Sequence, residues 1–283
     1  MSIKIIVDST ADMTPAVAEK VGIVPLTVHF GDREYTAGVD IDNQKFYEML
    51  AESDTLPTTS QPTPFAFAQE FRKAVDAGFE VICITCSGKL SGTNQSANIA
   101  AEEFEGKVTV VDSRTIAIGL GILAEYALKL IDRGMNAEQI VQRLLQKREK
   151  VRLLALVDTL EYLKKGGRVS PTVAFAGGLL NIKPVIAVSG GEIVMLGKAR
   201  GSRQGNNLLV QEIEKAGGVD FNCPLMLGYT GLSDAILKKY ISDSEELWQD
   251  HAESLPVSLV GSVVGTHAGP GAVAVAFFAR DEV

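Results

Sequence analysis

The sequence predicts an α/β protein of two domains, and three observations support this prediction. The length of 283 residues fits one large domain or two smaller domains that share a cleft. Through residues 1–150, short apolar runs alternate with helical patterns, which is typical of a parallel sheet covered on both faces. In residues 151–283 the pattern changes to hairpin strands and helices, as in an α+β domain. We therefore expect a domain boundary near residue 151.

In the first half, each element follows from a local pattern. Residues 3–7 form a continuous apolar run, which indicates a buried strand. Thr14-Pro15 and Thr63-Pro64 each join a capping residue to a proline at the first helical position, so each predicts the start of a helix. The expected strands are 3–7, 24–28, 80–86 and 108–111, and the expected helices are 15–20, 42–51, 63–77, 92–104, 115–133 and 137–150.

In the second half, the clearest signal is a hairpin. Ser189-Gly190-Gly191 separates two apolar runs and predicts a tight turn between antiparallel strands. A short helix is expected to end within residues 160–168, and a helix rich in small residues is expected at 171–180. The remaining expected strands are 153–157, 184–187, 192–197, 225–229, 258–264 and 272–278, with helices at 203–215 and 233–242.

The composition narrows the functional classes. A formal net charge of −8 argues against non-specific binding to nucleic acid, which relies on basic charge. No apolar stretch approaches the roughly 20 residues that span a membrane, and the N-terminal apolar run is too short for a signal peptide. We therefore expect a cytoplasmic protein with no nucleic-acid partner and no stable membrane insertion. Cys83 and Cys86 lie within an expected strand, so we interpret them as buried side chains and not as a redox or metal pair.

Two hydroxyl-rich segments are candidates for binding an anion. Residues 58–64 read T-T-S-Q-P-T-P, and the prolines fix the backbone that carries Thr59 and Ser60. An ordinary rigid loop that enters a helix explains this segment equally well. Residues 87–93, S-G-K-L-S-G-T, lie between a strand and a helix, where free N–H groups favour a carboxylate or phosphate near Ser91 and Thr93.

The second half supplies cations and one distinctive histidine. Arg168 follows a basic helix end and two glycines, a pattern that ordinary helix termination also produces. Arg200 lies in the segment G-K-A-R-G at the end of a hairpin strand. His267 lies in G-T-H-A-G-P-G, between two expected apolar strands. A purely structural histidine would not need so many glycines around it, so we predict that His267 is functional.

The motifs of common enzymes are absent or incomplete. Asp8 follows the first strand, but Asp12 is spaced wrongly for a phosphotransferase pair, so a hydrogen-bonded loop is the favoured interpretation. Gly88 and Ser91 do not have the spacing of a nucleophile elbow, and Gly119-Leu120-Gly121 lies inside a helical run and not at a strand-to-helix turn. We expect no catalytic residue, no metal and no cofactor. Hydroxyls, one histidine and a few cations remain, and together they indicate an anion pocket between the two domains.

The same segments show a family resemblance. The motifs D-S-T-A-D, T-S-Q-P, S-G-x-x-S-G-T, L-x-x-L-K-K-G-G-R, N-I-K-P, G-K-A-R-G and G-T-H-x-G-P-G-A extend from Asp8 to Ala272. Together they resemble the DegV family, which includes the fatty-acid-binding (FakB-type) subunits of bacterial fatty acid kinase. Each motif alone is weak, but their combination over nearly the whole chain is specific.

The resemblance implies a long-chain fatty acid held between the two domains of a non-catalytic subunit. It implies that Thr59 and Ser91 bind the carboxylate beside His267, and that a separate ATP-dependent kinase phosphorylates this carboxylate. Ser60, Thr93, Arg168 and Arg200 are then candidates for a secondary site or for facing the kinase. From sequence position alone, we expect the acyl chain to contact Phe65, Phe175, Leu179, Ile182 and Phe277.

Two alternatives stay open at this point. The chain could be a lipid carrier that has no kinase partner. It could also be an acyl hydrolase that uses Ser91 as nucleophile and His267 as base.

Overall fold

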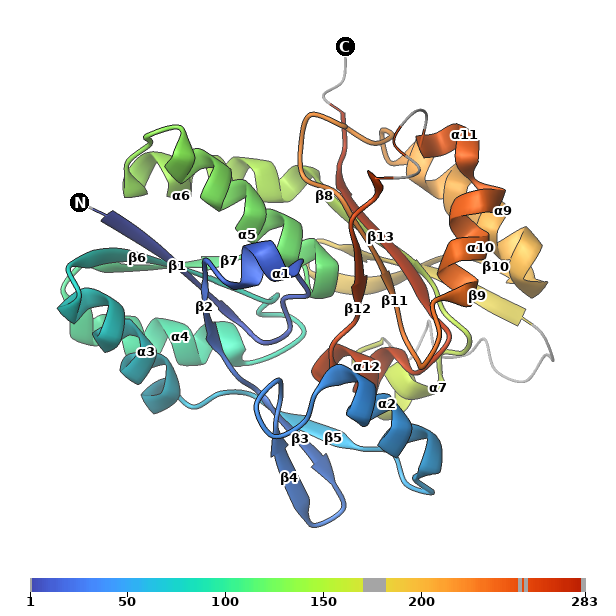
Figure 1. Cartoon of the computed structure of the whole chain (residues 1–283), viewed down its shortest axis with the longest axis horizontal. Coiled ribbons are helices and arrows are strands. Elements are labelled where there is room, and N and C mark those ends of the chain that lie inside the picture. Colours follow the sequence, from blue (N-terminus) through green and yellow to red (C-terminus); the bar gives the residue numbers. More distant parts are fainter. Residues whose placement is uncertain (1, 170–181, 249–250, 252–253, 281–283) are drawn as a thin grey trace.

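The structure is a computed structural model, and it describes residues 2–169, 182–248, 251 and 254–280. Its two main sheets lie side by side, with a small third sheet below the first (Figure 1). This arrangement confirms the predicted α/β fold class. Phe175 and Leu179 and the helix expected at 171–180 lie outside the described residues.

The first sheet is entirely parallel, as predicted. It contains β1 (Ser2–Asp8), β2 (Gly22–Val24), β6 (Phe79–Thr85) and β7 (Val108–Asp112) in the order β2-β1-β6-β7. Because successive side chains point to opposite faces, Ile5 packs toward one helical layer and Ile6 toward the other. The layers are α3 (Pro64–Asp76) with α4 (Thr93–Ala101), and α5 (Ala117–Asp132) with α6 (Ala137–Lys147). The short α1 (Pro15–Ala18) joins β1 to β2.

The second sheet has the order β10-β9-β8-β13-β11-β12, and only the pair β11–β12 is parallel. Its strands are β8 (Val151–Leu156), β9 (Ile182–Ser189), β10 (Glu192–Arg200), β11 (Met226–Tyr229), β12 (Val257–Leu259) and β13 (Val273–Phe278). The predicted β9–β10 hairpin is present, and Gly190 and Gly191 both have positive φ in its turn. One face of this sheet is covered by α9 (Gly201–Lys215), α10 (Ala235–Asp243) and α11 (Glu245–Trp248).

The third sheet was not predicted. The apolar run at 24–28 is not one strand, because Pro25 separates β2 from β3 (Thr27–Phe30). β3 turns back at Gly31 to pair with β4 (Arg33–Thr36) and also pairs with β5 (Thr58–Ser60), a segment expected to be a loop. The helix α2 (Asn43–Glu52) lies between β4 and β5 in the chain.

A second difference concerns the region of His267. Residues 258–264 were expected to be a strand, but β12 ends at Leu259 and the helix α12 (Ser262–Ala268) follows. His267 therefore lies in the last turn of a helix and not in a loop. The short helix α7 (Glu161–Lys165) packs beside α12.

The helix α5 contacts both main sheets. It packs against β1 and β6 on one side and against β8, β11 and β13 on the other. Residues of both halves thus share one apolar core, in which Ile84 and Phe278 belong to the same cluster. The expected boundary near residue 151 falls at the start of β8, and the division of the chain into two domains stays a prediction.

Candidate functional site

A cavity lies between the second sheet, α12 and loops from the first half of the chain. Its lining is mostly apolar, and small side chains cover its floor on the central strands of the sheet. These floor residues are Ala155 on β8, Gly228 on β11 and Ala274 on β13, which lie side by side on one face of the sheet. Because Ala155 and Ala274 carry only a methyl group, they leave room above the sheet for an extended apolar group.

Strand alternation explains which side chains reach this cavity. On β8, Leu153 and Ala155 face the cavity, whereas Leu154 and Leu156 face the opposite core beneath α9. The hydrophobic wall is completed by residues from several elements: Leu26, Leu90, Ile116, Leu163, Ile186, Val188, Ile193, Val260, Val263 and Val264.

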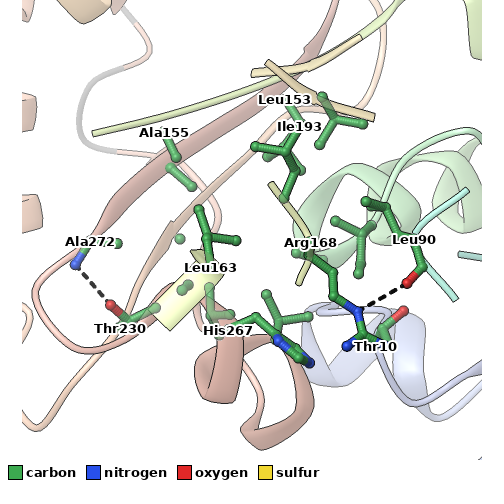
Figure 2. A pocket seen from close by; sticks show the side chains of 18 of the residues that line it. Thr10, Leu90, Leu153, Ala155, Leu163, Arg168, Ile193, Thr230, His267 and Ala272 are labelled. Atoms are coloured by element: carbon green, nitrogen blue, oxygen red, sulfur yellow. Dashed lines mark hydrogen bonds between the residues drawn. The ribbon is translucent and has the colours of Figure 1, made fainter. Parts of the chain in front are cut away.

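Polar groups gather at one end of the cavity. Thr59, Ser91, Arg168 and His267 all line it, although they come from four separate segments. In Figure 2, Arg168 and His267 lie near Thr10, whereas Leu153 and Ile193 lie together near the top of the view. An amphipathic ligand would therefore place its polar group near His267 and its apolar part over the sheet.

Thr59 and His267 form a direct hydrogen bond. Thr59 Oγ1 lies 3.0 Å from His267 Nε2, and the two residues are 208 positions apart in the chain. Thr59 faces inward because β5 pairs with β3 in a register that places it opposite the buried Val28. The unpredicted third sheet is thus what brings Thr59 to α12.

The protonation state of His267 follows from its surroundings. Its Nδ1 is buried and has no hydrogen-bond partner among the described residues. Burial, and then the charge of Arg168, lower the pKa of His267 from its ordinary value of 6.5 to about 4. The imidazole is therefore neutral near pH 7. A buried N–H group without a hydrogen-bond partner is rarer than a buried acceptor without one. We therefore infer that Nδ1 carries no hydrogen and that the proton is on Nε2.

This tautomer gives Thr59 a defined role. Nε2–H of His267 donates to Thr59 Oγ1, so the Thr59 hydroxyl keeps its own hydrogen for an acceptor in the cavity. The pair thus presents a hydrogen-bond donor at the polar end of an apolar space.

Ser91 lies two residues before α4 and is held by Thr93. Ser91 Oγ lies 2.8 Å from Thr93 Oγ1, and the Thr93 amide donates to Ser91 Oγ at 3.3 Å. Thr93 is fully buried, so it supports Ser91 and does not itself line the cavity. The backbone at Gly92 is in close contact with Gln61, where a Cβ would lie 2.2 Å from Gln61 Oε1.

Arg168 brings a positive charge to the same end. Its Nε donates to Leu90 O at 3.3 Å, and its guanidinium also donates to Gly166 O. Both acceptors are neutral carbonyl groups, so these bonds position the guanidinium without neutralising its charge. The charge is thus available to attract an anion toward Thr59 and His267.

The other predicted residues lie elsewhere. Ser60 points away from Thr59 and pairs with His29 Nε2 at 2.7 Å, while Arg200 is exposed at the end of β10. Phe65 is 70% exposed on α3 and does not line the cavity. Phe277 is buried on the opposite face of β13, in the core beneath α9 and α10. Ile182 begins β9 but is not among the lining residues.

Thr10, Tyr229 and Thr230 also line the cavity and were not predicted. Thr10 follows β1, and the carboxyl end of such a strand is a signal that could have identified it. Its hydroxyl and amide both donate to the buried carboxylate of Asp8. Asp8 also accepts the Cys86 amide at 2.7 Å, which agrees with the interpretation of Asp8 as a loop-ordering residue.

Comparisons with known proteins identify the family. A family model described as an uncharacterised protein of the DegV family matches residues 2–280. The chain belongs to the DegV family. A DegV domain-containing protein of Deinococcus radiodurans is 38% identical over an alignment of 283 positions, which covers 98% of each chain.

Three solved structures share the whole fold of this chain. A DegV family protein from Thermus thermophilus, described by its fatty acid binding, has a TM-score of 0.88 at 30% identity and covers 99% of this chain and 100% of its own. A stearic-acid-binding protein from Eubacterium ventriosum has a TM-score of 0.85 at 27% identity, with 97% of each chain covered. The fatty acid kinase B3 protein of Streptococcus pneumoniae, loaded with linoleic acid, has a TM-score of 0.84 at 25% identity and covers 99% of this chain and 100% of its own.

Two further properties concern the described part of this DegV chain. Within it, no set of three or more His, Cys, Asp or Glu side chains is arranged to hold a metal ion. None of its helices has both the length and the apolar character needed to cross a bilayer.

Proposed function

We propose that this DegV protein binds a long-chain fatty acid, with the acyl chain over the second sheet and the carboxylate beside Thr59, Ser91 and His267. The observation that carries this proposal is the Thr59–His267 hydrogen bond at the polar end of a mostly apolar cavity. Relatives that bind stearic or linoleic acid on the same fold support it.

The carboxylate would be recognised by hydroxyl donors and a nearby cation. The Thr59 hydroxyl, oriented by His267, and the Ser91 hydroxyl would each donate to one carboxylate oxygen. The guanidinium of Arg168 would balance the negative charge at this end. A carboxylate that leaves water needs such partners, because an unpaired buried charge is strongly unfavourable.

Burial of the acyl chain would supply most of the affinity. Each methylene removed from water contributes about 0.8 kcal/mol, so about 14 methylenes contribute roughly 11 kcal/mol before the costs of association and ordering. The small floor residues, such as Ala155 and Ala274, leave the space that the acyl chain would fill.

Lipid extraction tests the ligand directly. Protein purified from cells and then denatured should release a long-chain fatty acid that mass spectrometry identifies. Thr59→Ala should weaken oleate binding by about 1–3 kcal/mol, because a buried carboxylate oxygen loses its donor. Ser60→Ala is the matched control, since Ser60 points away from the cavity. Absence of lipid together with no uptake of oleate or palmitate would contradict the proposal.

We further propose that the bound carboxylate is presented to a separate kinase in the cytoplasm. The kinase would transfer the γ-phosphoryl group of ATP to a carboxylate oxygen and release ADP, which leaves an acyl-phosphate on this protein. Arg168 at the polar end would stabilise the added negative charge. The kinase-subunit relative from Streptococcus pneumoniae supports this role.

A reconstituted reaction tests this second step. Loaded protein, ATP and a purified fatty acid kinase catalytic subunit should yield acyl-phosphate, which hydroxylamine traps as a hydroxamate. Arg168→Gln should lower the rate, whereas Arg200→Gln, at an exposed position away from the cavity, is the control. Binding without phosphorylation by any such kinase would favour the stand-alone carrier.

The hydrolase alternative has less support. A serine hydrolase needs its nucleophile hydrogen-bonded to the base, but Ser91 pairs with Thr93 and His267 pairs with Thr59. Turnover of an acyl ester by the isolated protein, lost in Ser91→Ala, would revive this alternative.

A further inference from the structure

The turn that leads into α12 is held by side chains from the first half of the chain. The hydroxyl of Tyr47 donates to the backbone oxygen of Val260 at 2.9 Å, and both groups are buried. One residue later, the amide of Gly261 donates to Asp12 Oδ1 at 2.7 Å, again in a buried setting. These contacts join residues that are 213 and 249 positions apart, so they fix the start of α12 relative to the first half.

A third side chain acts on the same turn. Asn43 Nδ2 donates to the backbone oxygen of Leu259 at 3.2 Å. Three successive residues, 259–261, are therefore each bonded by a side chain from the first half. The amide of Val260 in turn donates to Tyr229 O on β11, at 2.9 Å. The turn is thus attached both to the second sheet and to the first half of the chain.

Tyr47 also meets α12 further along the helix. A Cβ on Gly265 would lie 2.5 Å from the Tyr47 hydroxyl oxygen, so the helix approaches this side chain as closely as glycine allows. His267 follows two residues later on the same short helix. Any displacement of Tyr47 would therefore move the helix that carries His267.

The groups involved are almost completely inaccessible to water. Tyr47 is 1% exposed and Asp12 is 6% exposed. A buried amide or carbonyl that loses such a partner cannot be satisfied by solvent, so the turn would have to rearrange.

We propose that Asp12 and Tyr47 are positioning residues for the carboxylate site: they fix the turn at 259–261 and the approach of α12, and thereby hold His267 against Thr59. This inference rests on the fatty acid site proposed above. Neither side chain lines the cavity, so each would act through α12.

The first test needs no ligand. The chain has only three histidines, so the imidazole signals of His267 can be assigned by NMR with a His267→Gln variant. Tyr47→Phe should shift the His267 imidazole resonances and move its titration toward that of a solvated histidine. Tyr240→Phe is the matched control, because Tyr240 is equally buried but belongs to the core beneath α9 and α10. Unchanged His267 signals in Tyr47→Phe would overturn the proposal.

The second test is a double-mutant cycle on oleate affinity. Tyr47→Phe should raise the Kd about two- to tenfold, the range expected for one lost hydrogen bond. In a His267→Gln background the same change should have little further effect, because the residue through which it acts is gone. An equal effect in both backgrounds would show that Tyr47 does not act through His267.

Asp12 offers a test by conservative replacement. Asp12→Ala should weaken oleate binding, whereas Asp12→Asn should restore it, since the amide oxygen of asparagine can accept the Gly261 N–H. Equal losses in both variants would remove Asp12 from the proposal. If wild-type protein binds no fatty acid, the proposed function fails, but the NMR comparison of Tyr47→Phe still decides whether His267 is positioned in this way.

Discussion

The imidazole of His267 lies directly against Gly166, where a Cβ would come within 2.2 Å of Nδ1. Gly166 ends α7 with an ordinary helical conformation, φ −72° and ψ −11°. Its lack of a side chain is therefore required by the histidine and not by its own backbone. The carbonyl oxygen of Gly166 also accepts from Arg168, so one residue orders both the histidine and the cation of the site.

Gly166→Ala should displace His267 and weaken fatty acid binding about tenfold, because the hydrogen bond to Thr59 is lost. The backbone itself tolerates alanine, so the variant should stay folded. Gly167→Ala is the informative control: Gly167 has φ +71° and open space around it, so alanine there should cost stability but not affinity. Titration calorimetry with oleate and urea unfolding separate the two effects. Full affinity in Gly166→Ala would mean that His267 does not hold the carboxylate.

His267 should also make the stability of the unliganded protein depend on pH. Its pKa is about 4 in the folded protein and 6.5 ordinarily, so between these values the unfolded chain binds a proton that the folded chain does not. The free energy of unfolding therefore rises with pH across this window. Below about pH 4 it should be about 3 kcal/mol lower than at pH values above 6.5. Urea unfolding of wild type and His267→Gln at several pH values checks this, and parallel curves would contradict it.

Asp12 should have the opposite pH dependence. Burial raises its pKa from 3.8 to about 7, and the Gly261 amide only partly offsets this. Between these values the folded protein holds a proton that the unfolded chain has lost, so the contribution of Asp12 to stability falls as pH rises. Asp12→Asn should therefore become more stable relative to wild type as the pH rises. The difference between their free energies of unfolding should change by about 4 kcal/mol in favour of the variant from about pH 3.5 to about pH 8. A constant difference across this range would show that Asp12 does not titrate in the folded protein.

The floor of the cavity should set the size of the acyl chain. Ala155→Leu adds a branched side chain above the sheet, so it should weaken oleate binding about tenfold while affecting laurate less. Competition binding with the two acids measures the change in preference. Ala51→Leu, which adds the same atoms at an exposed position on α2, should leave the preference unchanged.

The sequence was sufficient for the parallel sheet and for three of the groups that meet at the cavity. Apolar runs such as residues 3–7 identify buried strands by themselves. Hydroxyls and glycines indicate the segments that carry Thr59, Ser91 and His267, and the family resemblance singles out Thr59 and Ser91 within them. The helix around His267 could not be predicted, because Gly265 has a low helix propensity and its reason for being there is the close approach of Tyr47.

The residues that would contact the acyl chain could not be predicted, because the sequence does not show which face of a strand or helix is turned toward the cavity. Phe277 lies on the far face of β13, and a shift of one position in strand register decides which face a residue takes. Phe65 lies on the solvent side of α3, where a single aromatic gives no sign of its orientation. The floor of the cavity is made instead of small residues from three strands, β8, β11 and β13, which become neighbours only when the sheet forms.

The position of α5 between the two sheets restricts how this protein can be varied. One side of α5 must pack against β1 and β6, and the other side must pack against β8 and β13. Chimaeras that exchange residues 151–283 between DegV relatives would pair one side of α5 with a foreign sheet. Such chimaeras should therefore be less stable than either parent, whereas substitutions within the cavity leave the core around α5 intact.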